Sequence, residues 1–299
     1  MDAPTIIAKC HYFRQIGLWP RQEELNFEGW LSNFLPDERE FAIALLGQFI
    51  FYSGALTSQL FQATFHALSR SQCKDETNFR SAQIKWSRFL GEVIVTRVTG
   101  EKPHDSDSSF QYVRMARDRI GIPEDQIMKP EDALEAIRQS PHRPLVFVDD
   151  FLGSGKQFIR TWKRLYVMSS YGTKTSFAEF YYNNPDANIT YCVPVSTASG
   201  IDNVSKIAAK VKIESAHVLT KANSAISPES KLWPAHLQSQ AKDFIIQASL
   251  RAGIPESESL GLNDLGLTIA FEHGIPDASL RLFYAETNGW KPLKRRIAI

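Results

Sequence analysis

The stretch that decides the fold is P-L-V-F-V-D-D-F-L-G-S-G-K-Q-F, from Pro144 to Phe158. Its first half is an apolar, β-branched run typical of a buried central strand, and Asp149 and Asp150 stand where that strand ends. The glycine-rich residues 153–155 then open a helix. The carboxyl ends of parallel strands bind ligands, and helix starts present backbone N–H groups. The segment therefore predicts a ligand site.

The loop between strand and helix has the chemistry of a phosphate site. Its glycines let the backbone approach a phosphate closely, and the helix start adds positive potential. The Ser154 hydroxyl adds a donor and Lys156 adds a charge. We therefore predict that the phosphate is bound by Gly153, Ser154, Gly155, Lys156 and Gln157.

The paired carboxylates of Asp149 and Asp150 predict what lies beside that phosphate. Two carboxylates would repel a phosphate unless another group lay between them. A ribose meets this need, because its hydroxyls donate to the carboxylates while its 5′-phosphate occupies the loop. A Mg²⁺ ion can bridge carboxylate, ribose and pyrophosphate, so the same two aspartates are the candidate metal ligands. As strand-end residues, both are expected to face an open cleft.

Two alternatives compete for this segment. An ATP-binding P-loop requires a glycine five residues before the second glycine and Ser or Thr directly after the lysine. Those positions hold Asp150 and Gln157, which excludes that motif. The other alternative is a tight strand-to-helix turn with no ligand, and the aspartate pair favours a site over it.

The rest of the chain predicts an α/β fold. Short β-branched runs alternate with amphipathic segments from residue 92 onward, which indicates a mostly parallel sheet flanked by helices. Strands are expected at 93–98, 144–148, 188–195, 211–219, 267–271 and 280–284. Helices are expected at about 110–119, 130–140, 156–169 and 200–210, and the stretch 224–261 reads as loop, helix and loop.

The N-terminal part is predicted to be a helical layer. From about Phe27 to Arg70, apolar residues recur at steps of three and four, with a break at Pro36-Asp37. We expect a helical cap at 1–90 packed on an α/β domain at 91–299. The apolar faces of the cap are the surface expected to contact a protein partner.

Composition narrows the class of protein. The 299 residues are 43% hydrophobic and 22% charged, with a net charge of +1, so no global field favours nucleic acid or an anionic membrane. The basic, aromatic C-terminus at 290–296 leaves a nucleic-acid partner open. Three distant cysteines form neither a zinc spacing nor a disulfide framework. With no signal peptide and no membrane span expected, the sequence predicts a cytoplasmic protein.

The string V-F-V-D-D-F-L-G-S-G-K-Q resembles the phosphoribosyl pyrophosphate loop of type I phosphoribosyltransferases. That resemblance implies that Asp149 and Asp150 hold ribose hydroxyls and that Gly153 to Gln157 wraps the 5′-phosphate. The sequence departs from the family at Gly153, where a threonine is usual, and at Gln157, where a threonine often closes the loop. Both departures remove a hydroxyl donor.

Further candidates lie elsewhere in the chain, each with a structural alternative. The loop Gly100 to Ser109 occupies the place of the pyrophosphate loop, and its alternative is a solvated, capped loop. His273, after a late strand beside Glu272, is the candidate general acid/base, and its alternative is a histidine bonded within its own turn. Thr197 and Ser199-Gly200 either floor the pocket or cap a helix. The candidate pyrophosphate-binding side chains are Arg97, Lys102, His104, Ser106, Ser108 and Ser109.

Over most of its length the chain is also similar to phosphoribosyltransferase-like effectors of bacterial conflict and anti-phage systems. The features that carry this similarity are W-L-S-N-F at 30–34, the loop at 149–156, S-T-A-S-G-I at 196–201 and the tail from 265 onward. The tail departs from the pattern at Gly274 and at Asp277-Ala278.

Two functions follow as hypotheses. One is an enzyme that makes or breaks a bond at the anomeric carbon of a phosphoribosyl compound or nucleotide, by pentosyl transfer or N-glycosidic cleavage. The other is a non-catalytic module that senses a nucleotide or binds a partner. The aspartate pair favours the enzyme, and the lost hydroxyls at Gly153 and Gln157 favour the module.

Overall fold

The computed structural model describes residues 2–100, 109–168 and 172–296. Its contacts divide the chain into two compact units. The terminal unit comprises Met1–Leu56 and Leu219–Ile299, and the central unit comprises Thr57–Val218. These limits differ from the expected boundary between 90 and 91, and the helical cap at 1–90 stays a prediction.

The central unit contains a four-stranded parallel sheet in the order β2-β3-β7-β9. A second sheet has the order β10-β8-β4, in which β4 and β8 run parallel, and β5 pairs antiparallel with β6. The strands are β2 (Ile94–Arg97), β3 (Leu145–Val148), β4 (Phe151–Leu152), β5 (Tyr166–Val167), β6 (Lys174–Thr175), β7 (Ile189–Cys192), β8 (Val195–Thr197), β9 (Lys212–Glu214) and β10 (His217–Leu219).

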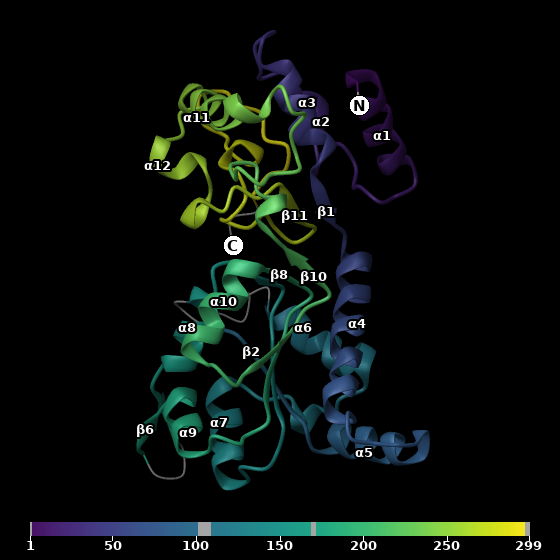
Figure 1. The fold of residues 1–299 in the computed structure, drawn as a ribbon, viewed down its shortest axis with the longest axis vertical. Helices are drawn as coiled ribbons and strands as arrows, with labels where there is room; N and C mark the ends of the chain where they lie inside the picture. Colours follow the sequence, from purple (N-terminus) through teal and green to yellow (C-terminus); the bar gives the residue numbers. More distant parts are fainter. Residues whose placement is uncertain (1, 101–108, 169–171, 297–299) are drawn as a thin grey trace. The chain divides into compact units, whose positions relative to one another are not determined.

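Helices cover both faces of the main sheet, as the near-continuous apolar runs of its strands require. Leu145 and Phe147 of β3 join one core cluster with α7 to α10, whereas Val146 and Val148 join another with α4 to α6. In Figure 1, α4 and α5 lie on one side of β2, and α7, α8 and α9 on the other. The helices are α4 (Gly54–Gln72), α5 (Phe79–Glu92), α6 (Ser109–Met115, continued by a π-helical turn at Ala116–Ile120), α7 (Pro130–Gln139), α8 (Lys156–Lys163), α9 (Phe177–Asn183) and α10 (Ala198–Ile207). This is the expected α/β class.

The terminal unit joins the two ends of the chain. Strand β1 (Ile50–Tyr52) pairs in parallel with β11 (Ile269–Phe271). The helices are α1 (Ala3–Gln15), α2 (Phe27–Leu31), α3 (Arg39–Gly47), α11 (Ala241–Arg251) and α12 (Glu256–Ser259). Short 3₁₀ turns span Lys221–Asn223, Gln238–Gln240, Leu262–Asp264 and Arg281–Phe283, and one in the central unit spans Glu124–Gln126. The N-terminal helices of the sequence pattern are therefore present.

Four expected elements are wrong in detail. The helical stretch from Phe27 to Arg70 contains strand β1, because Ile50–Tyr52 pairs with a segment near the other end of the chain. The expected strand at 280–284 is a 3₁₀ turn, and the carbonyl of its Leu282 accepts hydrogen bonds from two indoles. The expected strands at 188–195 and 211–219 each divide in two, the first on either side of Val193-Pro194, and Pro194 has no N–H to donate to a ladder.

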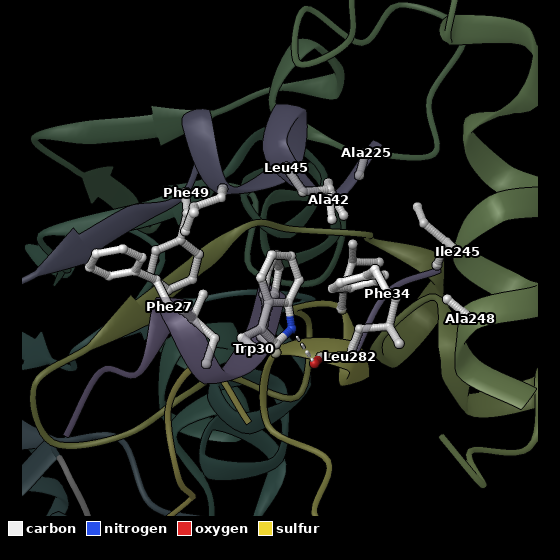
Figure 2. Packing of buried hydrophobic residues seen from close by; sticks show 14 of the residues in the cluster. Phe27, Trp30, Phe34, Ala42, Leu45, Phe49, Ala225, Ile245, Ala248 and Leu282 are labelled. Carbon is white, nitrogen blue, oxygen red and sulfur yellow. Dashed lines mark hydrogen bonds between the residues drawn. The ribbon is translucent and has the colours of Figure 1, made fainter. Parts of the chain in front are cut away.

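Trp30 anchors the core of the terminal unit (Figure 2). Its side chain is fully buried, its indole N–H donates to the Leu282 carbonyl at 2.8 Å, and its ring meets that of Phe34 edge-on at 4.7 Å. Trp30→Ala should lower the free energy of unfolding by about 3–5 kcal/mol, because it leaves a large cavity and removes one of the two indole hydrogen bonds to the Leu282 carbonyl. Urea denaturation measures this. Phe79→Ala, at a side chain that is 95% exposed, is the control and should change little; a small loss at Trp30 would contradict the assignment.

Candidate functional site

The candidate site is built on the end of β3. Its four residues are buried and pair in register with β2 on one side and β7 on the other. The central position of β3 explains its continuous apolar run. Asp149 and Asp150 follow directly, at the carboxyl edge of the parallel sheet, where the sequence placed them.

Asp149 is buried, with 3% of its surface exposed, so the expectation that both carboxylates face an open cleft is wrong for this residue. The Tyr191 hydroxyl donates to its Oδ2 at 2.9 Å, and the backbone N–H of Asp150 donates to its Oδ1 at 3.0 Å. Burial, and then the neighbouring Asp150 charge, hold the pKa of Asp149 well above its usual range. The reason is the alternation of side chains along a strand, which turns Asp149 toward the core that contains Tyr191.

Asp150 is partly exposed, unlike its neighbour. Burial first, and then the Asp150 charge, raise the pKa of Tyr112 on α6, and the Asp150 charge also contributes to the raised pKa of Tyr191, after burial and Asp149. Tyr112 belongs to the core cluster of α4 to α6. The two aspartates thus sit in different environments although they are adjacent in sequence.

The glycine-rich loop turns the chain from β4 into α8. Gly155 is the N-cap of α8 and has φ +81°, a left-handed conformation that favours glycine. No side chain caps this helix start. The N–H groups of the first turn of a helix lack intrahelical partners, so this end of α8 is suited to an anion.

Helix α10 and its N-cap residue make hydrogen bonds to the glycine-rich loop. The Thr197 hydroxyl donates to the Gly153 carbonyl at 2.6 Å and accepts from the Gly200 N–H at 2.9 Å, which makes Thr197 the N-cap of α10. The Asn203 amide donates to the Ser154 carbonyl at 3.2 Å. Thr197 therefore caps α10 and also holds the Gly153 carbonyl of the loop, and the role of Thr197 and Ser199-Gly200 in flooring a pocket stays a prediction.

The candidate pyrophosphate residues are only partly described. Lys102, His104, Ser106 and Ser108 lie outside the described residues. Arg97 ends β2, is 8% exposed and lies over the Phe110 ring at 5.4 Å. The Ser109 hydroxyl donates to the Val98 carbonyl at 2.7 Å, so it tethers the start of α6 to the end of β2. The role of these side chains in binding pyrophosphate stays a prediction.

The segment after β2 is tied to α8. Thr161 of α8 accepts from the Thr99 N–H at 3.0 Å and donates to the Thr99 carbonyl at 3.1 Å. Arg164 donates to the Thr99 hydroxyl and to the Gly100 carbonyl, each at 2.6 Å. One helix therefore begins at the glycine loop and also fixes the start of the second candidate loop.

A cavity of about 500 Å³ lies beside these contacts. Three of its lining residues carry positive charge, Arg97, Lys129 and Arg164, and Glu131 carries negative charge. It is completed by Thr99, Pro130, Leu165, Tyr166 and Val167. The aspartate pair and the glycine loop do not line it, so it is separate from the candidate ribose and phosphate positions.

The remaining candidates lie in the terminal unit. His273 follows β11, and its ring stacks on that of Phe271 at 5.3 Å. The Glu272 carboxylate accepts from the Gly54 N–H at 2.6 Å. The Asp pair belongs to the central unit, so a catalytic role for His273 stays a prediction.

The basic C-terminus is packed on the terminal unit. Trp290 is buried and its indole donates to the Leu282 carbonyl at 3.0 Å. Lys294 is also buried, and burial lowers its pKa. Arg295 pairs with Glu286 and Arg296 with Asp277, at 3.5 and 2.7 Å, which leaves this segment less cationic than its sequence indicates.

The described residues contain free thiols and neither a metal cluster nor a helix suited to cross a membrane. Among the described residues, no group of three or more His, Cys, Asp and Glu side chains forms a metal cluster. Cys10, Cys73 and Cys192 are free thiols, as their spacing predicts. In the part of the chain that the structure describes, every helix is too short or too polar to cross a membrane.

Sequence reasoning missed the residues that support the loop and the aspartates from other elements. Tyr191, Asn203 and Arg164 carried no motif, since each acts through a contact distant in sequence. The sequence offered one signal, a tyrosine in the buried strand beside β3. A buried tyrosine hydroxyl needs a partner, and the carboxylate at the strand end is one.

The chain was compared with known proteins. The PRTase-CE family model, which describes phosphoribosyltransferase conflict effectors, matches residues 27–296. No curated protein matches the chain. Among solved structures, it is similar to the crystal structure of orotate phosphoribosyltransferase from Aeropyrum pernix, with 15% identity over 46% of this chain and 72% of that chain and a TM-score of 0.24. Since the family model spans nearly the whole chain, this protein belongs to the PRTase-CE family.

Proposed function

We propose that this conflict effector binds a phosphoribosyl compound or nucleotide in its central unit. The ribose hydroxyls donate to the pair Asp149 and Asp150, and the 5′-phosphate occupies the loop from Gly153 to Gln157. The observation that carries this proposal is the adjacency of the two parts. A carboxylate pair at the end of β3 stands directly before a helix that starts at a left-handed glycine without a side-chain cap.

A Mg²⁺ ion is the proposed cofactor. The donor set fits it, because Mg²⁺ usually takes one or two protein carboxylates together with phosphate oxygens and water. Asp150 supplies a partly exposed carboxylate, and a pyrophosphate group of the ligand would supply most of the rest. The ion would neutralise charge on a leaving pyrophosphate.

The proposed chemistry is bond making or breaking at the anomeric carbon of the ribose. Positive charge develops on the sugar as pyrophosphate or a base leaves, so the protein would act mainly by holding the ribose and neutralising the leaving group. Arg97, Lys102, Ser108 and Ser109 are proposed as binding residues for pyrophosphate. Within a conflict-system family, such an activity would serve defence against phage.

One observation favours a second candidate, a nucleotide-sensing module without turnover. Gly153 and Gln157 stand where the resemblance to type I phosphoribosyltransferases implies hydroxyl residues. The nearby Thr197 hydroxyl does not replace them, because it donates to the Gly153 carbonyl. Incubation with phosphoribosyl pyrophosphate, NAD and nucleotides, followed by chromatography, separates the two candidates. Products favour the enzyme. Binding without products favours the module, whose partner surface is proposed on the N-terminal helices.

The double variant Asp149→Asn with Asp150→Asn should lose activity while the fold persists. Asparagine is isosteric with aspartate, but the end of β3 would no longer present a carboxylate to the ribose hydroxyls. Calorimetry with phosphoribosyl pyrophosphate and Mg²⁺ should detect at least a tenfold loss of affinity. Circular dichroism should give an unchanged spectrum. Full activity in this variant, or its unfolding, would rule out the ribose assignment.

A further inference from the structure

The carboxylate of Asp149 is already committed to contacts inside the protein. Each of its oxygens accepts one hydrogen bond, Oδ2 from the Tyr191 hydroxyl at 2.9 Å and Oδ1 from the Asp150 N–H at 3.0 Å. Only 3% of the residue surface is exposed. A ribose hydroxyl would need an open face of this carboxylate, and burial removes it.

The donor to Asp149 is itself held firmly. Tyr191 lies on β7 in register with Phe147 of β3, and it is 1% exposed. Its ring stacks on Phe158 at 4.5 Å, with 20° between the planes, and Phe158 belongs to the first turn of α8. The hydroxyl is thus fixed by the same helix that starts at the glycine loop.

Asp150 differs from Asp149 in its exposure. It is partly exposed, and its backbone N–H is the group that donates to Asp149. That bond fixes the backbone of Asp150 relative to the strand end. A fixed backbone keeps the Asp150 carboxylate in position to accept from two ribose hydroxyls, and that position is lost when the supporting groups move.

We infer that the two aspartates have different roles: Asp150 contacts the ribose hydroxyls, whereas Asp149 and Tyr191 form a positioning pair that holds Asp150. This inference rests on the proposed function, since it assigns the work within the same site. Asp149 then affects ribose binding by holding Asp150 and the end of β3 in position. Tyr191 is a positioning residue that no motif identified.

Single variants with two probes test the assignment. Calorimetry with ribose 5-phosphate reports on ribose and phosphate together, and calorimetry with inorganic phosphate reports on the loop. Asp150→Asn should weaken ribose 5-phosphate binding roughly tenfold to a hundredfold, because a charged acceptor of hydroxyl groups is lost. Asp149→Asn should weaken this binding clearly less than Asp150→Asn does. Its amide oxygen accepts from the Asp150 N–H, and its amide nitrogen donates to the Tyr191 hydroxyl. That hydroxyl therefore changes from hydrogen-bond donor to acceptor.

Tyr191→Phe tests the positioning role. It leaves Asp149 Oδ2 buried without its donor, so affinity for ribose 5-phosphate should fall several-fold while affinity for inorganic phosphate stays unchanged. Tyr181→Phe is the matched control in the same unit. Its hydroxyl is buried without a hydrogen-bond partner, so both affinities should be retained. A purely structural effect of Tyr191 would lower both affinities together.

The outcomes separate this inference from the proposed function. If wild type binds ribose 5-phosphate no better than inorganic phosphate, the ribose assignment fails and the division of roles fails with it. If wild type prefers ribose 5-phosphate but Asp149→Asn loses as much affinity as Asp150→Asn, only the division of roles is overturned. Unchanged ribose 5-phosphate binding by Tyr191→Phe would remove Tyr191 from the pair.

Discussion

Gly200→Ala should disrupt the glycine loop. A Cβ at this position would lie 2.2 Å from the Gly153 carbonyl oxygen and 3.0 Å from that of Leu152. Both are backbone atoms, which cannot rotate away, so α10 and the loop must separate. We expect a loss of roughly 3 kcal/mol or more in the free energy of unfolding, at the upper end for overpacking, and at least a tenfold loss of affinity for ribose 5-phosphate.

Gly91→Ala is the matched control for this variant. Gly91 also lies within a helix of the central unit, α5, and a Cβ there would meet nothing within 4 Å. The alanine should leave ligand affinity unchanged and stabilise the helix by about 0.5–1 kcal/mol, since glycine is the poorer helix former. Chemical denaturation of the two variants side by side measures the difference. If Gly200→Ala behaves like Gly91→Ala, the close support of the loop by α10 is wrong.

Gly155→Val should abolish binding at the loop. The residue has φ +81°, a conformation that a β-branched side chain resists, and its Cβ would lie 2.9 Å from Val204 Cγ2 and 3.2 Å from the Gly200 carbonyl oxygen. The new side chain would also cover the start of α8, where the phosphate is proposed to bind. Calorimetry should detect a loss of roughly a hundredfold in affinity for phosphoribosyl pyrophosphate, which corresponds to about 2.7 kcal/mol.

Gly121→Val separates backbone strain from the effect on the site. Gly121 has φ +85° and ends the π-helical turn after α6, and a Cβ there meets nothing within 4 Å. Both valine variants should lose stability through the left-handed backbone, by about 1–2 kcal/mol for strain alone. Only Gly155→Val should lose the ligand. Loss of ligand in both variants would attribute the effect to general destabilisation.

The central strand, the aspartates and the glycine loop could be predicted from sequence because they are local. An apolar β-branched run, two acidic residues and a glycine turn occur within fifteen consecutive residues, and the structure has β3, β4 and α8 there. The helix ends were predicted for the same reason: Pro130 begins α7, and Gly121 is left-handed after α6. Local residue preferences determine such features.

What sequence could not predict depends on contacts between distant segments. Ile50–Tyr52 is a strand only because it pairs with Ile269–Phe271, and its local pattern continues that of the helices around it. The difference between Asp149 and Asp150 arises from Tyr191, which is 42 residues downstream of Asp149. The close packing of Gly200 against the loop also depends on a contact between distant segments. The sequence alone does not reveal it, since a glycine near a helix start has many local explanations.

The most direct test of the central claim is a crystal structure of the full chain with phosphoribosyl pyrophosphate and Mg²⁺. The account predicts density for the 5′-phosphate at the loop from Gly153 to Gln157 and for the ribose hydroxyls beside Asp150. Density for the ligand elsewhere, for example in the cavity lined by Arg97, Lys129 and Arg164, would contradict it.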